Sequence, residues 1–175
     1  MAIYLRLGNP SDLAFIVATE QAEQQSGCIG HWSLEQHQAA VTNPDIAHYV
    51  IERNADRQCV GYLILRGIQN VHQNIELQRI VVTEKGKGYG RTALQQVKEL
   101  AFKTYNAHRL WLDVKSHNPR AKALYTSEGF IVEGTLRECL QLSRTPQPHQ
   151  PLTQARISLV IMSILRSEYE LASLP

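Results

Sequence analysis

Residues 82–91 read VTEKGKGYGR, and this stretch is the most informative part of the sequence. Three glycines alternate with bulky residues at the point where a predicted strand is followed by a predicted helix. Glycine permits positive φ and lets another group approach the main chain closely. The helix that begins here presents unpaired N–H groups and the positive end of its dipole to the loop. Helix starts favour acids, yet this one is basic and no acid occurs between Glu84 and Glu99. The stretch therefore predicts an anion site, and phosphate is the ligand that such helix starts bind.

The segments on either side of this loop show the periodicities of strands and helices. Residues 46–82 read as an antiparallel meander of three β-rich runs. The helix after the loop repeats apolar residues at i, i+3, i+4, i+7 and i+8 up to about Tyr105, which predicts one buried stripe. Further strands are predicted at 3–7, 108–114, 130–140 and 156–164, and further helices from about 10, at 33–41 and at 119–129. This order predicts a mixed α/β layer with helices on a sheet, and the prolines of 143–153 predict an exposed loop.

Two common phosphate loops do not fit residues 82–91. A dinucleotide fingerprint needs Gly-x-Gly-x-x-Gly, but Arg91 stands three residues after Gly88, and Ala93 stands three residues after Gly90. The Walker pattern needs Gly-Lys followed by Ser or Thr, which does not occur at the required offset. A dinucleotide fold and a P-loop nucleotidase are therefore both disfavoured.

The spacing instead resembles the acetyl-coenzyme A pyrophosphate loop of the GNAT family of N-acetyltransferases. That loop reads Arg or Gln, two residues, Gly, one residue, then Gly or Ala. Here Lys85, Gly88 and Gly90 take these places, and Lys85 is a departure that keeps the positive charge. The resemblance implies an α/β fold of three layers, in which a mixed, mostly antiparallel central sheet of about six or seven strands is flanked by about four helices. It also implies a single N-acetyltransferase domain over residues 1–175.

Residues 118–130, NPRAKALYTSEGF, carry a second part of the resemblance. In relatives the Asn contacts the pantetheine arm, the Tyr lies near the acetyl thioester, and the Gly-Phe pair begins the next strand. Asn118 is also a good N-cap before Pro119, and Tyr125 could be a core residue. The two motifs at this separation support each other, so the resemblance extends over most of the chain.

The resemblance implies a set of cofactor contacts. The backbone of residues 80–82 is expected to pair with the pantetheine amides in the manner of an added strand. The expected cofactor-binding residues are Ile80, Val81, Val82, Lys85, Gly86, Lys87, Gly88, Tyr89, Gly90, Arg91, Asn118, Lys122 and Tyr125. Acetyl-coenzyme A is the expected cosubstrate. No metal is expected, since His48, His72 and His117 lack ligand spacing and read as loop or surface residues.

Direct acetyl transfer needs a neutral amine, an acceptor for its proton, and a proton donor for the departing thiolate. Tyr125 is the predicted donor. Glu76 is the predicted base, because strand alternation places it on the face of Gln78; a solvated strand-end acid is the alternative. Glu133 and Glu138 are further candidates for the base. A covalent acyl-enzyme is disfavoured because no Gly-x-Ser-x-Gly elbow occurs.

The charge of the chain is unevenly distributed. The formal net charge is +2, but residues 77–122 carry ten Lys or Arg against three acids, so this block is +7 and the remainder is −5. A local basic block predicts an anionic ligand, with a solvated helix face as the alternative. The block has few aromatic residues for base stacking, which disfavours nucleic-acid binding.

Composition narrows the class of protein. The chain has 175 residues, 43% of them hydrophobic, and three cysteines without paired spacing. Its most apolar late stretch, residues 158–165, is far shorter than the roughly 20 residues that span a bilayer. We therefore expect a reduced cytoplasmic protein without a membrane partner.

Two further segments narrow the resemblance within the family. Residues 133–138, EGTLRE, and residues 161–169, IMSILRSEY, look like the branch that acetylates ribosomal-protein N-termini. The expected acceptor is a primary amine, either of a protein N-terminus or of a small molecule, that reacts in a ternary complex. An acyl-coenzyme A-binding module without transferase activity is the alternative. A monomer and a homodimer are both open.

Overall fold

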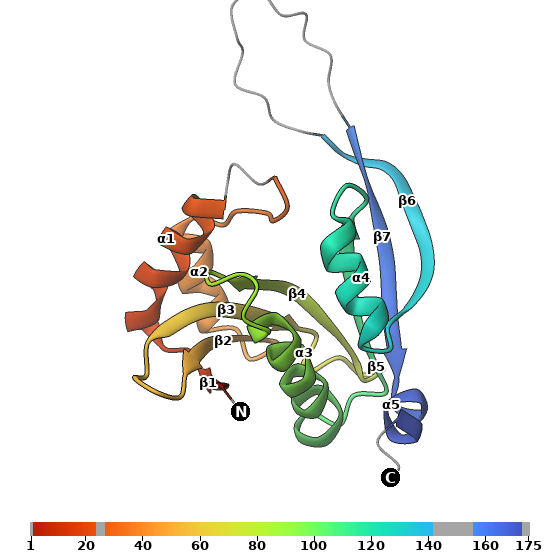
Figure 1. Cartoon of the computed structure of the whole chain (residues 1–175), viewed down its shortest axis with the longest axis horizontal. Coiled ribbons are helices and arrows are strands. Elements are labelled where there is room, and N and C mark those ends of the chain that lie inside the picture. Colours follow the sequence, from red (N-terminus) through yellow and green to blue (C-terminus); the bar gives the residue numbers. More distant parts are fainter. Residues whose placement is uncertain (1, 24–26, 142–155, 173–175) are drawn as a thin grey trace, which may run out of the picture.

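Apolar and β-branched residues build seven strands of one sheet (Figure 1). The computed structural model describes residues 2–23, 27–141 and 156–172, so the loop predicted at 143–153 lies outside the described residues. The strands are β1 Ile3–Leu7, β2 Ile46–Arg53, β3 Cys59–Arg66, β4 Asn74–Val82, β5 Arg109–Lys115, β6 Ile131–Gln141 and β7 Arg156–Leu165. Their order is β1-β2-β3-β4-β5-β7-β6, and every neighbouring pair is antiparallel except β4 with β5.

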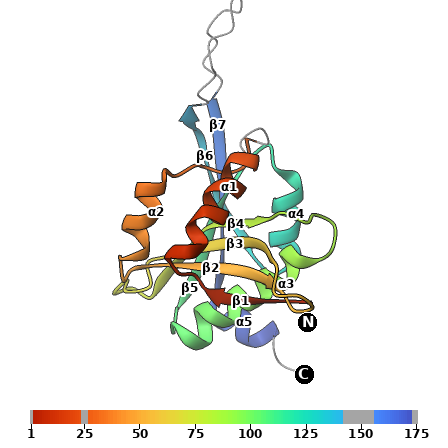
Figure 2. The same ribbon diagram turned by 90° about the vertical axis from the view of Figure 1, so that its left-hand side faces the viewer.

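Helices cover both faces of this sheet (Figures 1 and 2). They are α1 Leu13–Glu23, α2 Leu34–Val41, α3 Tyr89–Glu99, α4 Pro119–Ser127 and α5 Arg166–Ala172. Helices α1 and α2 lie on one face and α3 and α4 on the other, so the predicted three-layer fold with a mostly antiparallel sheet is confirmed. The prediction missed α5, which follows β7 directly and stacks Tyr169 on Phe102 with ring centroids 4.8 Å apart.

Local sequence explains where the helices begin and end. Ser33 and Gln36 form the predicted capping box of α2, in which the Ser33 N–H donates to Gln36 Oε1 over 2.7 Å. Helix α3 passes at Glu99 into a π-helical turn over Leu100–Thr104, and Tyr105 is the C-cap of that turn, so the predicted end near Tyr105 is confirmed. Asn106, the next residue, has a φ of +53°. Left-handed backbone of this kind ends a helix, and Asn tolerates it better than most residues.

The core divides into the two faces of the sheet. Leu94 and Val97 of α3 pack with Leu63 and Leu77, which confirms the buried stripe predicted for that helix. Leu13 and Ile16 of α1 pack with Tyr62 and Ile64 on the opposite face. Strands β3 and β4 are therefore covered on both sides, and their apolar residues alternate between two cores.

A β-bulge interrupts the pairing of β3 with β4. Arg79 pairs with Ile64 and Leu77 pairs with Leu65, so Gln78 is an extra residue without a partner in the register. The predicted sharing of one face by Glu76 and Gln78 rested on strict alternation, and the bulge breaks that alternation. Beyond it, Arg79 faces α1 and forms an ion pair with Glu20.

Strands β4 and β5 pair only over their first residues. Asn74 pairs with Arg109 and Glu76 with Trp111, and no later pair follows among the described residues. The strands then separate, which leaves residues 77–82 of β4 without a neighbour on that side. This wedge is the opening that an added extended chain would need.

One sequence expectation about histidine is wrong. His48 was expected at a loop or the surface, but it lies in β2 with 3% of its surface exposed. It is buried because β2 is an inner strand, covered by α2 on one face. In the part of the chain that the structure describes, no helix is long and apolar enough to cross a membrane.

Candidate active site

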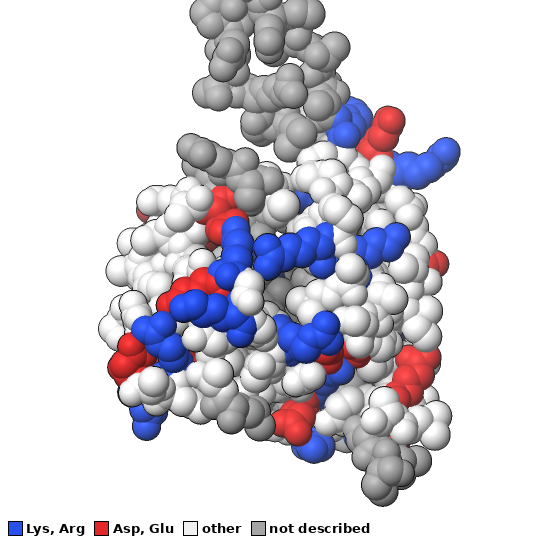
Figure 3. All heavy atoms as spheres, in the orientation of Figure 1, with Lys and Arg blue, Asp and Glu red and all other residues white. Residues whose placement is uncertain are grey.

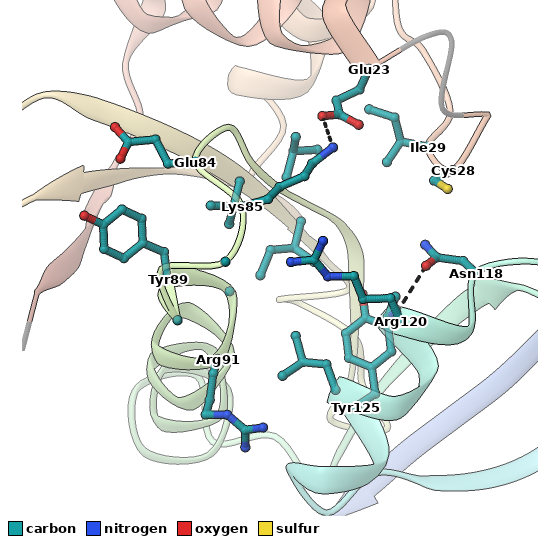
Figure 4. Close-up of a pocket in the computed structure, with 18 residues that line it drawn as sticks. Glu23, Cys28, Ile29, Glu84, Lys85, Tyr89, Arg91, Asn118, Arg120 and Tyr125 are labelled. Carbon is teal, nitrogen blue, oxygen red and sulfur yellow. Dashed lines mark hydrogen bonds and ion pairs between the residues drawn. The ribbon is translucent and has the colours of Figure 1, made fainter.

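A cavity of about 440 Å³ opens between the end of β4, the start of α3, α4 and the segment after α1 (Figure 4). The predicted residues that line it are Ile80, Val81, Val82, Lys85, Gly86, Gly88, Tyr89, Gly90, Arg91, Asn118 and Tyr125. The two sequence motifs, some 30 residues apart, therefore meet around one space. Lys87, Lys122 and Glu76 are not among the residues that line it.

The glycine loop has the backbone that the sequence predicts. Gly86 and Gly88 have φ of +87° and +77°, and a Cβ on either would meet no atom within 4 Å. Conformation, not space, therefore requires glycine at these two positions. Gly88 is the N-cap of α3 and no described side chain caps that helix, so its first-turn N–H groups are left for an anionic ligand.

Three cations of the loop are already paired with carboxylates. Lys85 Nζ lies 2.6 Å from Glu23 of α1, and Lys87 Nζ lies 2.5 Å from Glu84. Arg91 lies 2.5 Å from Glu128, a buried acid at the end of α4. Much of the positive charge counted in the sequence is thus compensated locally. The remaining excess still gathers on this face, where Figure 3 shows Lys and Arg side chains around a hollow.

Arg120 lines the cavity but was not among the cofactor-binding residues expected from the sequence. It extends from the first turn of α4 across the cavity toward the glycine loop (Figure 4). Among the described residues it has no ion pair or hydrogen bond with a carboxylate, so its charge is available to a ligand. Lys122, which was predicted instead, is exposed and does not line the cavity. Asn118 accepts a hydrogen bond from the Ala121 N–H and so caps α4. This cap places Arg120 in the first turn of the helix, where its side chain lines the cavity.

Replacing Arg120 by methionine is expected to raise the Kd for acetyl-coenzyme A about tenfold, because hydrogen bonds from arginine to phosphate are among the strong ones. Isothermal titration measures this directly. Lys122→Met is the matched control, since it removes the same charge from an exposed side chain of α4 that does not line the cavity. Equal Kd values for the two variants would contradict the assignment of Arg120.

Tyr125, the predicted proton donor, is one of the residues that line the cavity. It is 9% exposed, lines the cavity from α4, and packs its ring near Phe130. Burial, with a further effect of the charge of Asp113, raises the pKa of Tyr125 to about 12. The phenol therefore stays protonated at neutral pH and can donate. Within the described residues its hydroxyl has no hydrogen-bond partner, so the donor is available to a ligand.

Glu76 lies at the apex of the wedge between β4 and β5. It is the last β4 residue that pairs with β5, opposite Trp111, and its partner on the other side is Arg66. Burial raises the pKa of Glu76, and the charge of Asp113 raises it further. A carboxylate with a raised pKa is a stronger base, which suits the predicted role.

The two further candidates for the base lie elsewhere. Glu133 of β6 is held by Arg109 at 2.5 Å and accepts a hydrogen bond from Ser163, and these contacts keep the pKa of its carboxyl below the usual range. Glu138 is exposed on the same strand with a φ of +50°. Like Glu76, neither lines the cavity. Of the three acids, only Glu76 lies on β4 where that strand separates from β5, so Glu76 stays the predicted base.

Residues after α1 form a wall that the sequence did not indicate. Cys28 and Ile29 line the cavity across from Asn118 and Arg120 (Figure 4). They lie outside the two motifs at residues 82–91 and 118–130 that carry the family resemblance. No spacing or residue type marks them, because their place depends on how α1 is packed on the sheet.

The profile of the Acetyltransferase (GNAT) family matches residues 14–130, about two thirds of the chain and both motifs around the cavity. The chain belongs to this family. It is an N-acetyltransferase that uses acetyl-coenzyme A, as the glycine loop and the motif at 118–130 indicated. Spermidine N(1)-acetyltransferase of Vibrio cholerae serotype O1 is 29% identical over 144 residues, which cover 77% of this chain and 82% of the relative. The protein of the same name from Escherichia coli K12 is 28% identical, over 77% of this chain and 76% of the relative.

Solved structures agree with the fold of this GNAT chain. A spermidine N-acetyltransferase chimaera from Vibrio cholerae and hSSAT has a TM-score of 0.79 at 25% identity, over 96% of this chain and 99% of that one. Vibrio cholerae spermidine N-acetyltransferase in complex with CoA and spermine has a TM-score of 0.79 at 24% identity, over 97% and 98%. These relatives support the family but not the ribosomal-protein branch. A further structure of the Vibrio cholerae enzyme is dodecameric, so a monomer or homodimer stays a prediction here.

Proposed function

We propose that this acetyltransferase acts on a primary amine of a small polyamine of the spermidine class. The carboxylates of Glu76 and Asp113 carry the proposal. Glu76 pairs with Trp111 at the apex of the wedge, and Asp113 lies two residues further along β5 on the same face as Trp111. In agreement with this placement, the charge of Asp113 raises the pKa of Glu76. Two acids close together where β4 and β5 separate suit an acceptor with several positive charges. The names of the relatives support the same class of acceptor.

The cavity suits acetyl-coenzyme A at its other end. The uncapped start of α3 and the Arg120 guanidinium fit the phosphates, and the unpaired edge of residues 80–82 fits the pantetheine amides. The cosubstrate supplies an acetyl thioester. The protein has to orient that thioester, take a proton from the amine and return one to the sulfur.

Glu76 and Tyr125 divide the proton transfers between them. A polyamine nitrogen is protonated at neutral pH, so a base must first generate the free amine. One proton leaves the ammonium to bulk water, and Glu76 accepts the second, directly or through a water, as the nitrogen bonds to the acetyl carbon. The bond between that carbon and sulfur then breaks, Tyr125 donates its phenolic proton to the thiolate, and the phenolate and the protonated Glu76 return to their starting states by proton exchange with water. The proposed base belongs to β4 and the proposed acid to α4.

An acceptor panel tests the choice of amine. Spermidine and spermine are expected to be acetylated with a kcat/KM at least about tenfold above that of peptides that begin with Ala or Ser. Product masses from equal incubations with acetyl-coenzyme A give the comparison. Faster acetylation of the peptides would overturn the polyamine proposal and favour a protein N-terminus. Stabilisation by acetyl-coenzyme A in a thermal melt is the control for a folded cofactor site.

A further inference from the structure

A buried cluster of polar side chains lies beneath the wall of the cavity and takes no part in the chemistry above. Its centre is Glu20 of α1, which is 1% exposed. Glu20 accepts hydrogen bonds from the Tyr62 hydroxyl over 2.7 Å and from the Trp32 backbone N–H over 2.8 Å, and it forms an ion pair with Arg79. We call Glu20, Tyr62, Arg79 and Trp32 the anchoring cluster. It joins α1, β3, β4 and the segment before α2.

Two histidines close the cluster on its far side. His37 Nε2 lies 3.2 Å from a Glu20 oxygen, and His37 Nδ1 lies 3.1 Å from His48 Nε2. Burial, followed by the nearby positive charges, lowers the pKa of His48 to about 4, so that ring is neutral at pH 7. Burying an ion pair often stabilises a fold no better than apolar residues of the same volume. We therefore expect the cluster to position the chain segments that it joins, and not only to stabilise the fold.

That geometry concerns residues 27–32, which are held at both ends by side chains from other elements. At one end Lys115 Nζ of β5 donates to the Gly27 carbonyl over 2.6 Å. At the other end Glu20 holds the Trp32 N–H. Between these two points the chain passes Arg79 closely, since a Cβ on Gly30 would lie 3.1 Å from Arg79 Nη2. The part between the anchors includes the cavity wall.

The same arginine also belongs to the strand that faces the cofactor. Arg79 directly precedes residues 80–82, and its guanidinium lies over the Trp32 ring, 5.2 Å from the centroid. Glu20 therefore links the wall formed by Cys28 and Ile29 to the edge of β4 across the cavity. A change at Glu20 alters the separation of these two sides without touching either.

We propose that Glu20 is a positioning residue for the amine acceptor, which sets the distance between the wall at residues 28–29 and β4. The inference rests on the proposed function in one respect, that the acceptor enters between these two surfaces. The phosphate end of the cavity is formed by α3 and α4, whereas the hydrogen bonds and the ion pair of Glu20 within the described residues join α1 to Trp32, β3 and β4. Loss of Glu20 should therefore weaken acceptor binding and spare cofactor binding.

Glu20→Gln tests this, because it removes the charge and keeps the size and one accepting oxygen. With spermidine as acceptor, KM for the amine is expected to rise about tenfold or more, since small misplacements are costly at a reacting centre. KM for acetyl-coenzyme A is expected to stay within about twofold of the wild-type value. Asp12→Asn is the matched control: Asp12 is buried directly before α1 and paired with Arg6 at 2.8 Å, and within the described residues it has no hydrogen bond or ion pair with residues 27–32. Equal amine KM values in the two variants would overturn the proposal.

Alkylation of Cys28 gives a readout that needs no acceptor. Iodoacetamide labelling, followed by peptide mass spectrometry, is expected to be several-fold faster at Cys28 in Glu20→Gln and unchanged at Cys59. If that variant does not fold, Tyr62→Phe removes one donor to Glu20 and keeps the ion pair, and it should accelerate Cys28 labelling to a smaller extent. An unchanged rate of Cys28 labelling in the folded variant would contradict the inference. If spermidine is not acetylated at all but Cys28 labelling rises, the polyamine proposal fails and the positioning role stands.

Discussion

Replacing Tyr125 by phenylalanine is expected to lower kcat about 100-fold, because a positioned proton donor contributes roughly that much or more to a transfer step. The Kd for acetyl-coenzyme A should stay within about twofold, since the ring that lines the cavity is retained. Tyr125 hydroxyl has no hydrogen-bond partner among the described residues, so the fold should lose little stability. Single-turnover acetylation measures the effect on the chemical step, free of product release.

Tyr49→Phe is the matched control for that experiment. Its hydroxyl lies 2.6 Å from the Tyr105 hydroxyl in the core and does not line the cavity. Its loss should lower the melting temperature and leave kcat near the wild-type value. If Tyr125→Phe turns over as fast as Tyr49→Phe, then Tyr125 only packs, and the sulfur takes its proton from another source.

Glu76→Gln is expected to lower kcat/KM by about 100-fold and to remove the acid limb of the pH profile. The base works only when deprotonated, so wild-type activity should fall as the pH drops through the pKa of Glu76. That pKa lies above its ordinary value because of burial and the charge of Asp113. Glutamine keeps the size of the side chain but cannot accept the proton. Initial rates between pH 5 and 9 with saturating acetyl-coenzyme A give the profile.

Asp113→Asn independently tests whether the charge of Asp113 raises the pKa of Glu76. Without the Asp113 charge, the pKa of Glu76 should fall, so more of Glu76 is ionised at a given acid pH. The acid limb should therefore move to lower pH, while the rate on the plateau changes less than in Glu76→Gln. A limb that stays in place in Asp113→Asn would belong to a group other than Glu76.

Much of the fold could be predicted from local sequence. The glycine loop, the apolar stripe of α3 and the Asn118-Pro119 start of α4 depend on propensities and spacings within about ten residues. The first strand was predicted at 3–7 and observed as Ile3–Leu7. These elements were predictable because each one satisfies its own backbone and shows its buried face as a period. Helix α5 was missed, because Tyr169 takes its place from packing on Phe102 and not from a pattern.

The candidate site was predictable only where it consists of motifs. Lys122 and Arg120 are both basic and both lie after Asn118, and only the cap geometry of α4 decides which one lines the cavity. The bulge at Gln78 turns Arg79 toward α1, and strict alternation cannot anticipate an extra residue in a strand. His48 shows the same limit, since a histidine in an inner strand has no sequence mark of burial.

The loop at residues 82–91, together with the motif at 118–130, by itself indicated the GNAT family and predicted an anion site at a helix start. The glycines of the loop and the lack of acids after Glu84 fit a strand-to-helix turn that binds phosphate. Tertiary structure alone decided which charges remain for that ligand and what stands opposite it. Glu23 pairs with Lys85 across 62 positions of sequence, and Glu20 pairs with Arg79 across 59. Such pairs form because α1 packs on the sheet, and contacts over that separation leave no local pattern to read.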